Sequence, residues 1–163
     1  MISRQQALKD QILHDFIETR AQLIMAASCL EAAEQDRVYL GSWSVKDLLA
    51  HLVGWDEANL QAAQAVLAGR LPAFYQYRDR NWQAFNALLV AKYRRDDFRE
   101  LLELVRQSHQ QLVDFLQALP AEQMANDYGV RYRGYKVIIS RLLQSEIADE
   151  QVHLKQIQEA FVK

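Results

Sequence analysis

Apolar residues recur every three to four positions along most of this chain, which is the spacing of one face of an α-helix. The first run covers about Arg4 to Glu34, and Ser3 with Gln6 three residues later has the form of a capping box at its start. Its apolar stripe comprises Leu8, Ile12, Phe16, Leu23 and Ala27. The pattern predicts a first long helix that buries this stripe.

A second helix has the clearest start signal in the sequence. Ser44 suits the N-cap position and Asp47 the third helical position, where both side chains satisfy free backbone N–H groups. The apolar pattern then continues to about Ala68, and Gly69 suits the position just after a helix end. The sequence therefore predicts a second helix that starts after Ser44 and ends near Ala68.

Aromatic residues gather in the next segment, from about Arg70 to Arg95. Part of this segment, about Arg80 to Tyr93, has a helical pattern of its own. The segment is too long for a simple hairpin connection between two helices. Its length is typical of a crossover that traverses a bundle and leaves the helices on either side of it parallel.

Two further long helices are predicted, one from an Asp96 cap to Leu119 and one from about Tyr135 to Phe161. Four helices of roughly 23 to 31 residues would each extend about 35 to 45 Å. We therefore predict an all-α fold, a single four-helix bundle domain over residues 1–163 with a long, partly helical crossover between helices two and three. Bundles of this kind place metal sites in the core between facing helices.

Composition limits the cellular compartments and the partners expected for this bundle. The longest apolar runs are too short to span a membrane, and the first residues contain no apolar segment typical of a secretory signal. The single cysteine, Cys29, cannot form an internal disulfide, which fits a reducing compartment. A net charge of −2 leaves no electrostatic footprint for nucleic acid. We expect a soluble, cytoplasmic protein with neither a nucleic-acid nor a membrane partner.

Three polar residues from two distant segments form a candidate site. His51 interrupts the apolar pattern of the second helix, and Asp149 and His153 stand four apart in the fourth helix, where such positions share one face. Two imidazoles and a carboxylate are ligand types that divalent transition metals take, and three protein ligands leave a position open for water or substrate. The three residues can meet only if the second and fourth helices are antiparallel.

A structural interpretation of the same residues stays open. A single histidine such as His51 is more often a hydrogen-bonded structural residue than a metal ligand. Asp149 with His153 has the spacing of an ordinary surface pair, which contributes a few tenths of a kcal/mol.

Two neighbours extend the candidate site. Glu146 shares a stripe of the fourth helix with Asp149 and His153. It is a candidate for a fourth ligand, for a general base, or for a partner that orients an imidazole. Trp55 lies one turn after His51, where it either lines a substrate cavity or fills the core as a large apolar residue.

The segment from Trp43 to Trp55 reads W-S-V-K-D-L-L-A-H-L-V-G-W and resembles the start of the second helix in DinB-like four-helix bundle proteins. In that family the histidine matched by His51 is a metal ligand, and the last helix carries His-x-x-x-His followed by Gln-Ile. Here His153 matches the second of those histidines and precedes a Gln-Ile pair, whereas Asp149 replaces the first.

The resemblance implies one divalent transition metal, zinc or nickel in the first place, held by His51, Asp149 and His153. A set of two histidines and one carboxylate also suits iron or manganese, and the exchange of histidine for aspartate equally fits a member that has lost its metal. The family includes thiol-dependent transferases, hydrolases and members that protect against reactive small molecules, among them a branch of the colibactin self-protection type.

Two functions are then expected. A metal-dependent hydrolase or thiol transferase would use the open metal position to lower the pKa of a water or a thiol, with Glu146 for proton transfer. Trp55 and the crossover aromatics would bind its reactive small-molecule substrate and exclude water. The alternative is a non-catalytic bundle that binds a small molecule or pairs as a homodimer, which Asp149 in place of a histidine favours.

Overall fold

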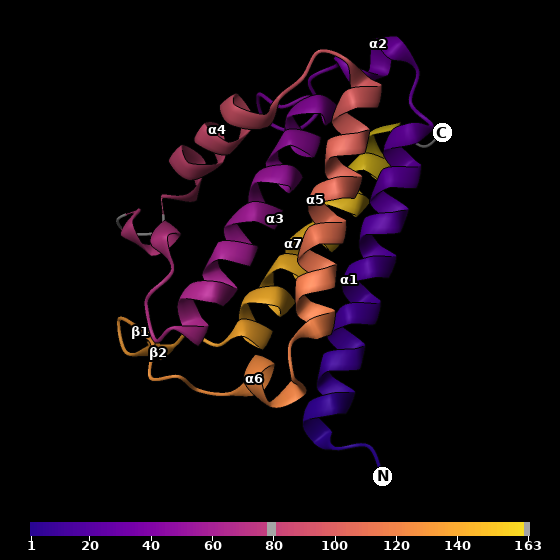
Figure 1. Ribbon diagram of the computed structural model, residues 1–163. Helices are drawn as coiled ribbons and strands as arrows, with labels where there is room; N and C mark the ends of the chain where they lie inside the picture. The colour runs from indigo at the N-terminus through magenta and orange to yellow at the C-terminus, as the bar shows by residue number, and fades with distance from the viewer. Residues whose placement is uncertain (78–80, 162–163) are drawn as a thin grey trace.

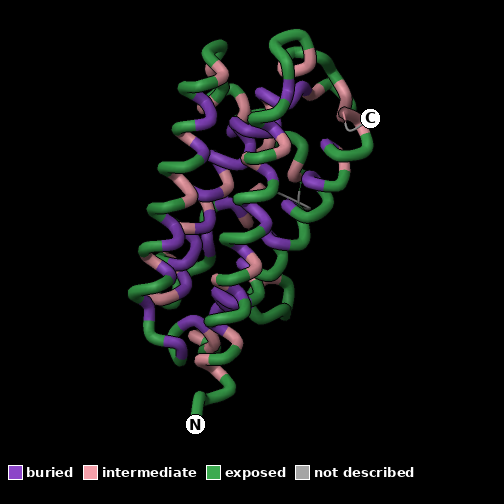
Figure 2. The backbone as a smooth tube through the Cα atoms, turned by 90° about the vertical axis from the view of Figure 1, so that its right-hand side faces the viewer, coloured by how far each residue is buried: buried purple, intermediate pink, exposed green. Residues whose placement is uncertain are grey.

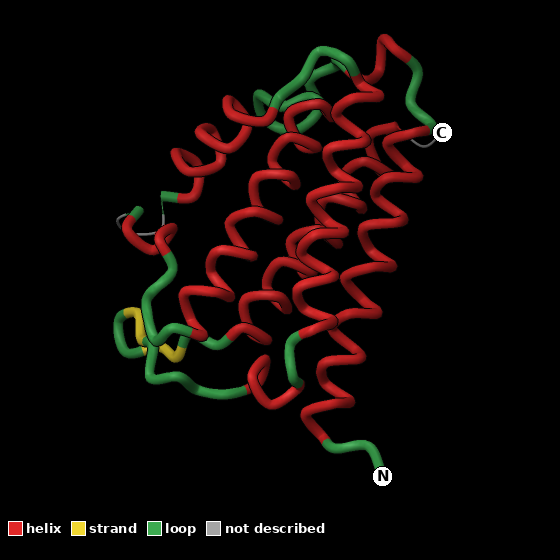
Figure 3. The backbone as a smooth tube through the Cα atoms, viewed as in Figure 1, coloured by secondary structure: helices red, strands yellow, loops and turns green. Residues whose placement is uncertain are grey.

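Four long helices lie side by side in the computed structural model, which describes residues 1–77 and 81–161 (Figure 1). They are α1 (Arg4–Ser28), α3 (Val45–Leu67), α5 (Phe98–Ala118) and α7 (Ile139–Phe161). Helix α1 packs mainly on α7, and α3 packs mainly on α5. The predicted all-α four-helix bundle is confirmed (Figure 3). No helix in the described ranges is both long enough and apolar enough to cross a membrane.

The connection between α3 and α5 traverses the bundle. It contains a short 3₁₀ helix, η1 (Ala73–Gln76), and α4 (Trp82–Tyr93), which packs along α3. Because the crossover carries the chain back, α3 and α5 run in the same direction and α7 runs opposite to α3 (Figure 1). The predicted crossover is confirmed, although Arg80, the predicted start of its helix, lies outside the described residues.

Capping chemistry sets the start of α3. Asp47 N donates to Ser44 Oγ at 3.4 Å, and Ser44 N donates to Asp47 Oδ2 at 2.8 Å, which completes the expected capping box. Arg94, directly after α4, donates to Asp47 Oδ1 at 2.8 Å. The cap and the end of the crossover together determine where α3 begins, and therefore which way His51 points two turns later.

The first helix is shorter than predicted. Helix α1 ends at Ser28, and a separate short helix, α2 (Ala32–Gln35), follows after a break. Glu31 begins α2 with a capping box in which Glu31 N donates to Glu34 Oε2 at 3.0 Å. The capping box at Glu31 stabilises the start of a new helix, so α1 does not continue through this segment. The apolar stripe ends at Ala27, one residue before the end of α1, whereas the prediction extended the helix to Glu34.

Two later boundaries also differ from the prediction. Asp97, rather than Asp96, caps α5, and its Oδ1 accepts from two backbone N–H groups of the first turn at 2.8 and 3.0 Å. The residues predicted to open the fourth helix form β2 (Tyr135–Lys136), which pairs antiparallel with β1 (Arg131–Tyr132). Gly134 in the turn between them has φ of +83°, a conformation that favours glycine and ends any helix before α7.

The core is divided into two apolar clusters. One includes Phe16, Leu116 and Leu143, and the other includes Leu23 and Leu49. Figure 2 shows buried positions along the length of the bundle. Between the two clusters the four bundle helices contribute polar side chains instead.

Arg20 is the centre of this polar layer. Its Nη1 and Nη2 donate to the two carboxylate oxygens of Asp56 at 2.7 and 2.9 Å, and its Nε donates to Glu150 Oε2 at 3.1 Å. A further hydrogen bond joins Arg20 Nη2 to Glu150 Oε1, and Ser108 Oγ donates to Asp56 Oδ2 at 2.6 Å. Arg20, Asp56 and Glu150 are at most 1% exposed. The layer links α1, α3, α5 and α7 through buried charges that are stable only when paired.

Gly54 lets α4 approach α3 closely. A Cβ atom at Gly54 would stand 2.6 Å from the Cβ of Leu89 on α4, and a Cβ cannot move without its backbone. Gly54→Ala gains about 1 kcal/mol of helix propensity, but overpacking costs about 1 to 3 kcal/mol, so we expect a net loss of stability and a displaced α4. Urea denaturation measures this loss. A variant stabilised by the full propensity gain would contradict the close approach of the two helices.

Candidate metal centre

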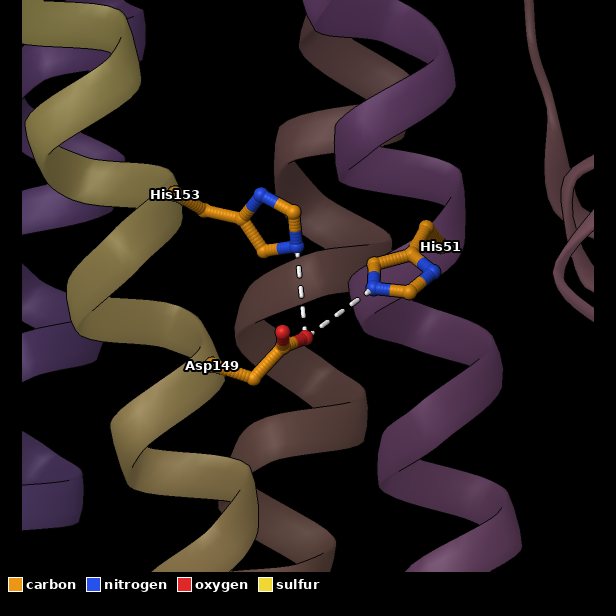
Figure 4. Close-up of side chains that lie close together, drawn as sticks. All are labelled: His51, Asp149 and His153. Carbon is orange, nitrogen blue, oxygen red and sulfur yellow. Dashed lines mark ion pairs between the residues drawn. The ribbon is translucent and has the colours of Figure 1, made fainter. Parts of the chain in front are cut away.

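The structure brings His51, Asp149 and His153 together between α3 and α7 (Figure 4). Asp149 Oδ2 lies 3.3 Å from His153 Nε2 and 3.7 Å from His51 Nε2. One ligand atom of each residue lies within 4.8 Å of the other two, and the imidazole rings are 5.2 Å apart at an angle of 80°. The antiparallel course of α3 and α7 places the three residues at one level of the bundle.

Gln156 orients the ring of His153. His153 Nδ1 donates to Gln156 Oε1 at 2.9 Å, so the ring carries a proton on Nδ1 and its Nε2 points toward Asp149. Histidines that bind metals generally donate their second ring N–H in this way. Helical spacing places Gln156 on the same stripe of the fourth helix as Asp149 and His153, but the sequence did not predict that it orients His153.

His51 is buried without a hydrogen bond. Its side chain is 2% exposed, neither ring nitrogen has a partner among the described residues, and Asp149 at 3.7 Å is too distant for one. Trp43 and Trp55 flank the ring at centroid distances of 5.0 and 6.3 Å. Unsatisfied buried nitrogens cost free energy unless a ligand accepts the lone pair. No described residue lies within hydrogen-bonding distance as a structural partner of the His51 ring.

The ionisation of the three residues suits a divalent cation. Burial lowers the pKa of His51 below its ordinary 6.5, so this ring stays neutral and keeps its lone pair. Burial acts to raise the pKa of Asp149, but His153 and His51 outweigh it and hold that pKa below its ordinary value. Burial acts to lower the pKa of His153, but Asp149 outweighs it and raises that pKa, so a bound cation would compete with a proton at this ring. Two imidazoles and an ionised carboxylate at this spacing fit a zinc-like ion.

A cavity of about 350 Å³ opens beside the three residues. Trp55 from α3 and Phe74, Tyr75 and Trp82 from the crossover form its aromatic wall. Trp55 contacts Phe74 and Trp82 edge to face, with centroids 5.5 and 5.7 Å away, and donates from Nε1 to Asn86 Oδ1 at 2.8 Å. The structure thus places Trp55 in a cavity wall. The cavity has the size of a small-molecule site, with an aromatic wall facing polar side chains.

Glu146 lines the same cavity. It is 6% exposed, and its Oε1 has no hydrogen-bond partner in the described part of the chain. Burial raises the pKa of Glu146 well above its ordinary value, and the charges of Glu150 and Asp149 raise it further. Glu146 is absent from the group of described residues whose ligand atoms converge. Its position and its raised pKa, which favours the protonated carboxyl, suit proton transfer better than metal ligation.

The sequence prediction missed the polar layer behind the site. Arg20 falls at a core position of the first helix, between Phe16 and Leu23 at helical spacing. An arginine in an apolar stripe signals a buried counter-charge. Its partners, Asp56 and Glu150, stand on two other helices. Only the packing of those helices identifies them.

Residues 15–157 match the model of the DinB superfamily. The chain belongs to the DinB superfamily. The match covers the candidate centre and most of the bundle, and it confirms the resemblance seen at the start of the second helix. Among curated protein sequences, none matches this DinB-superfamily chain.

Solved structures share the fold of this DinB-superfamily protein. The colibactin self-resistance protein ClbS, in complex with a dsDNA, is 16% identical with a TM-score of 0.77 over 93% of this chain and 94% of that chain. YfiT from Bacillus subtilis, described as "a probable metal-dependent hydrolase with an unusual four-helix bundle topology", is 18% identical with a TM-score of 0.63 over 98% and 88%. The sibling lethal factor precursor DfsB is 18% identical with a TM-score of 0.76 over 93% of each chain. At these identities the likeness shows a common fold.

The exclusion of nucleic acid as a partner was wrong. ClbS, a protein of the same fold, is crystallised in complex with double-stranded DNA. Net charge is a sum over the whole chain, whereas phosphate contacts depend on where individual Lys and Arg side chains stand. A net charge of −2 therefore does not exclude nucleic acid for a DinB-superfamily bundle.

Proposed function

We propose that this DinB-superfamily protein is a metal-dependent enzyme, a hydrolase or a thiol transferase, that acts on a reactive small molecule. The convergence of His51, Asp149 and His153 beside a cavity carries this proposal. When bound there, a divalent transition metal, zinc or nickel in the first place, supplies Lewis acidity that lowers the pKa of a water or a thiol. The names of ClbS as a self-resistance protein and of YfiT as a metal-dependent hydrolase support this class of reaction.

The residues of the chain prepare the site in two ways. Gln156 holds the His153 ring with Nε2 directed into the site, so this ligand needs no rearrangement when a metal binds. Trp55 and Trp82 exclude water from the cavity and offer flat apolar faces to a substrate.

In this proposal Glu146 is the general acid of the reaction. Because burial and its acidic neighbours raise its pKa and favour the protonated carboxyl, it can give a proton to the group that leaves the substrate. Glu146 lines the cavity, so its carboxyl can reach that group. A carboxyl in such surroundings is a general acid rather than a base.

Metal content tests the proposal. Plasma mass spectrometry of the purified protein is expected to find about one divalent ion per chain, lost in His51→Ala and Asp149→Ala. His14→Ala, at an exposed position of α1, is the matched control and retains the ion. A wild-type protein that is metal-free and ignores added zinc, nickel and manganese would overturn the proposal.

Glu146→Gln separates the proton-transfer role from metal binding. This variant is expected to keep its metal and to lose about a hundredfold or more in turnover of a hydrolase or thiol-transferase substrate, because an amide donates no proton to a leaving group. Turnover unchanged from wild type would remove Glu146 from the reaction and leave the metal site standing.

A second candidate function is a non-catalytic small-molecule binder. Asp149 is 53% exposed, and its carboxylate lies between both histidines, so the cluster can pair internally without a metal. A binder of this kind predicts a melting temperature that rises with ligand concentration in metal-free protein, with no turnover.

A further inference from the structure

The cavity continues along α3 and α7 beyond the candidate metal ligands. His51, Trp55 and Asn59 stand at four-residue intervals on α3, and all three line the cavity. Asn59 therefore lies two turns, about 12 Å, along the helix from His51. On the antiparallel α7, Glu146 is displaced from Asp149 in the same direction. Asn59 and Glu146 form what we call the inner subsite.

Both residues of the inner subsite carry a buried polar atom without a partner. Asn59 is 3% exposed and Glu146 is 6% exposed. Neither Asn59 Nδ2 nor Glu146 Oε1 has a hydrogen-bond partner among the described residues. Asn59 Nδ2 is a donor and Glu146 Oε1 is an acceptor. Buried groups of this kind are destabilising unless a ligand or a water satisfies them, so the inner subsite calls for a ligand with both an acceptor and a donor.

The inner subsite offers no counter-charge to an anionic group. No lysine or arginine is present among the described residues that line the cavity. In the polar layer behind them, the guanidinium of Arg20 is already paired with Asp56 and Glu150. A carboxylate or phosphate on the ligand would therefore be buried there without a partner, which is strongly unfavourable.

The aromatic wall determines which kind of group can bind outside the inner subsite. Trp55, Phe74 and Trp82 contact one another edge to face, with centroids between 5.5 and 5.8 Å apart. The Trp55 indole is held in place by its hydrogen bond to Asn86. Rigid aromatic surfaces of this kind bind flat apolar groups.

We propose that the inner subsite binds a neutral carboxamide or lactam group of the substrate, with the apolar part of the substrate against the aromatic wall. The amide carbonyl accepts a hydrogen bond from Asn59 Nδ2, and the amide N–H donates to Glu146 Oε1. Asn59 and Glu146 belong to different helices, and a planar group with its acceptor and donor on different atoms bridges them. The assignment rests on the proposed function for the position of the reacting end, which lies toward His51.

Binding of small amides tests the assignment. Nuclear magnetic resonance titration of the metal-loaded protein compares benzamide with benzoate, acetophenone and benzyl alcohol, which differ from benzamide in charge, in the N–H group and in the placement of donor and acceptor. Benzamide is expected to bind about tenfold more tightly than each of the three, the factor that corresponds to one buried hydrogen bond. Equal binding of all four compounds, or no saturable binding of benzamide, would overturn the assignment.

Variants of Asn59 localise the effect. Asn59→Asp and Asn59→Ala both remove the donor, and each is expected to weaken benzamide binding about tenfold. Glu146→Gln keeps an acceptor oxygen and is expected to bind benzamide within about threefold of wild type. Asn81→Asp, which preserves the cap of α4 at an exposed position, is the matched control and binds as wild type. Circular dichroism shows that each variant is folded, and wild-type binding by both folded Asn59 variants would overturn the assignment.

Metal content measured on the same samples separates the two proposals. A metal-bound wild type with no preference for benzamide would overturn the inner subsite and leave the proposed function standing. A wild type that binds no metal but keeps the preference for benzamide would overturn the proposed function and retain the subsite as part of a binding protein. The variant His51→Ala is expected to lose the metal and to keep the preference for benzamide over acetophenone and benzyl alcohol, because Asn59 and Glu146 are unchanged and Asn59 stands two turns from His51.

Discussion

Arg20→Ala is expected to lower the free energy of unfolding by about 3 to 5 kcal/mol, because it leaves two buried carboxylates without their counter-charge. Asp56 and Glu150 are at most 1% exposed, and the guanidinium of Arg20 is their shared ion-pair partner. Burial acts to lower the pKa of Arg20, but the two carboxylates outweigh it and raise that pKa, so the arginine is charged in the folded protein at any ordinary pH. The expected loss of stability therefore comes mainly from removing a buried positive charge, and not only from the loss of packing.

Urea denaturation at neutral pH measures the effect of Arg20→Ala. Arg106→Ala is the matched control, because Arg106 is 48% exposed and its contact with Glu103 spans 4.0 Å. A surface pair of this kind contributes about 0 to 1 kcal/mol. A loss of stability in Arg20→Ala no larger than in Arg106→Ala would contradict the role of the polar layer.

The stability of the protein is expected to fall by about 2 kcal/mol between pH 7 and pH 5 through His109 alone. Burial and, to a smaller extent, the positive charge of Arg20 together lower the pKa of His109 from 6.5 to about 3. The unfolded chain takes up a proton at this histidine below about pH 6.5, whereas the folded protein does so only near pH 3. The stability linked to His109 is therefore complete above pH 6.5 and is lost progressively as the pH falls toward 3.

The pH dependence is isolated by removing the titrating group. His109 packs on Phe16 at a centroid distance of 4.4 Å, and its ring nitrogens have no hydrogen-bond partner among the described residues. His109→Leu and His109→Gln cannot take up a proton, so both are expected to flatten the difference in unfolding free energy between the two pH values by about 2 kcal/mol. Other titrating groups, such as His153, contribute equally to wild type and variants and cancel in the comparison. Variants with the wild-type pH dependence would contradict a buried, neutral His109.

The helix starts show how far local sequence chemistry reaches. The reciprocal hydrogen bonds of Ser44 and Asp47 involve residues three apart, so the sequence was sufficient to predict where α3 begins. The break after Ser28 was not predicted, because the capping box of Glu31 and Glu34 that starts α2 falls inside the range assigned to the first helix. The β1–β2 hairpin replaced the first predicted turn of α7 because the turn at Gly134 overrides a weak helical pattern.

For the candidate site, the sequence was sufficient to predict which residues share a face of each helix. Helical spacing was sufficient to place Trp55 on the same side of α3 as His51, and Asp149 on the same side of α7 as His153. These two helix faces meet only if α3 and α7 are antiparallel, and the course of the crossover between α3 and α5 determines that direction. Asn59 was overlooked, although it stands four residues after Trp55. An asparagine on a buried stripe is itself a signal of a polar site, because its amide needs hydrogen-bond partners.

By itself, the sequence determined the long helices, the membership of the DinB superfamily and the residue types available on each helix face, because caps and periodicity act over a few neighbouring residues. Only the tertiary structure decided that Arg20 meets Asp56 and Glu150, since those partners lie 36 and 130 residues away in the chain. It also decided that Glu146 and Asn59 share a cavity with His51. Contacts between helices depend on the relative direction and rotation of whole elements, which no local pattern specifies.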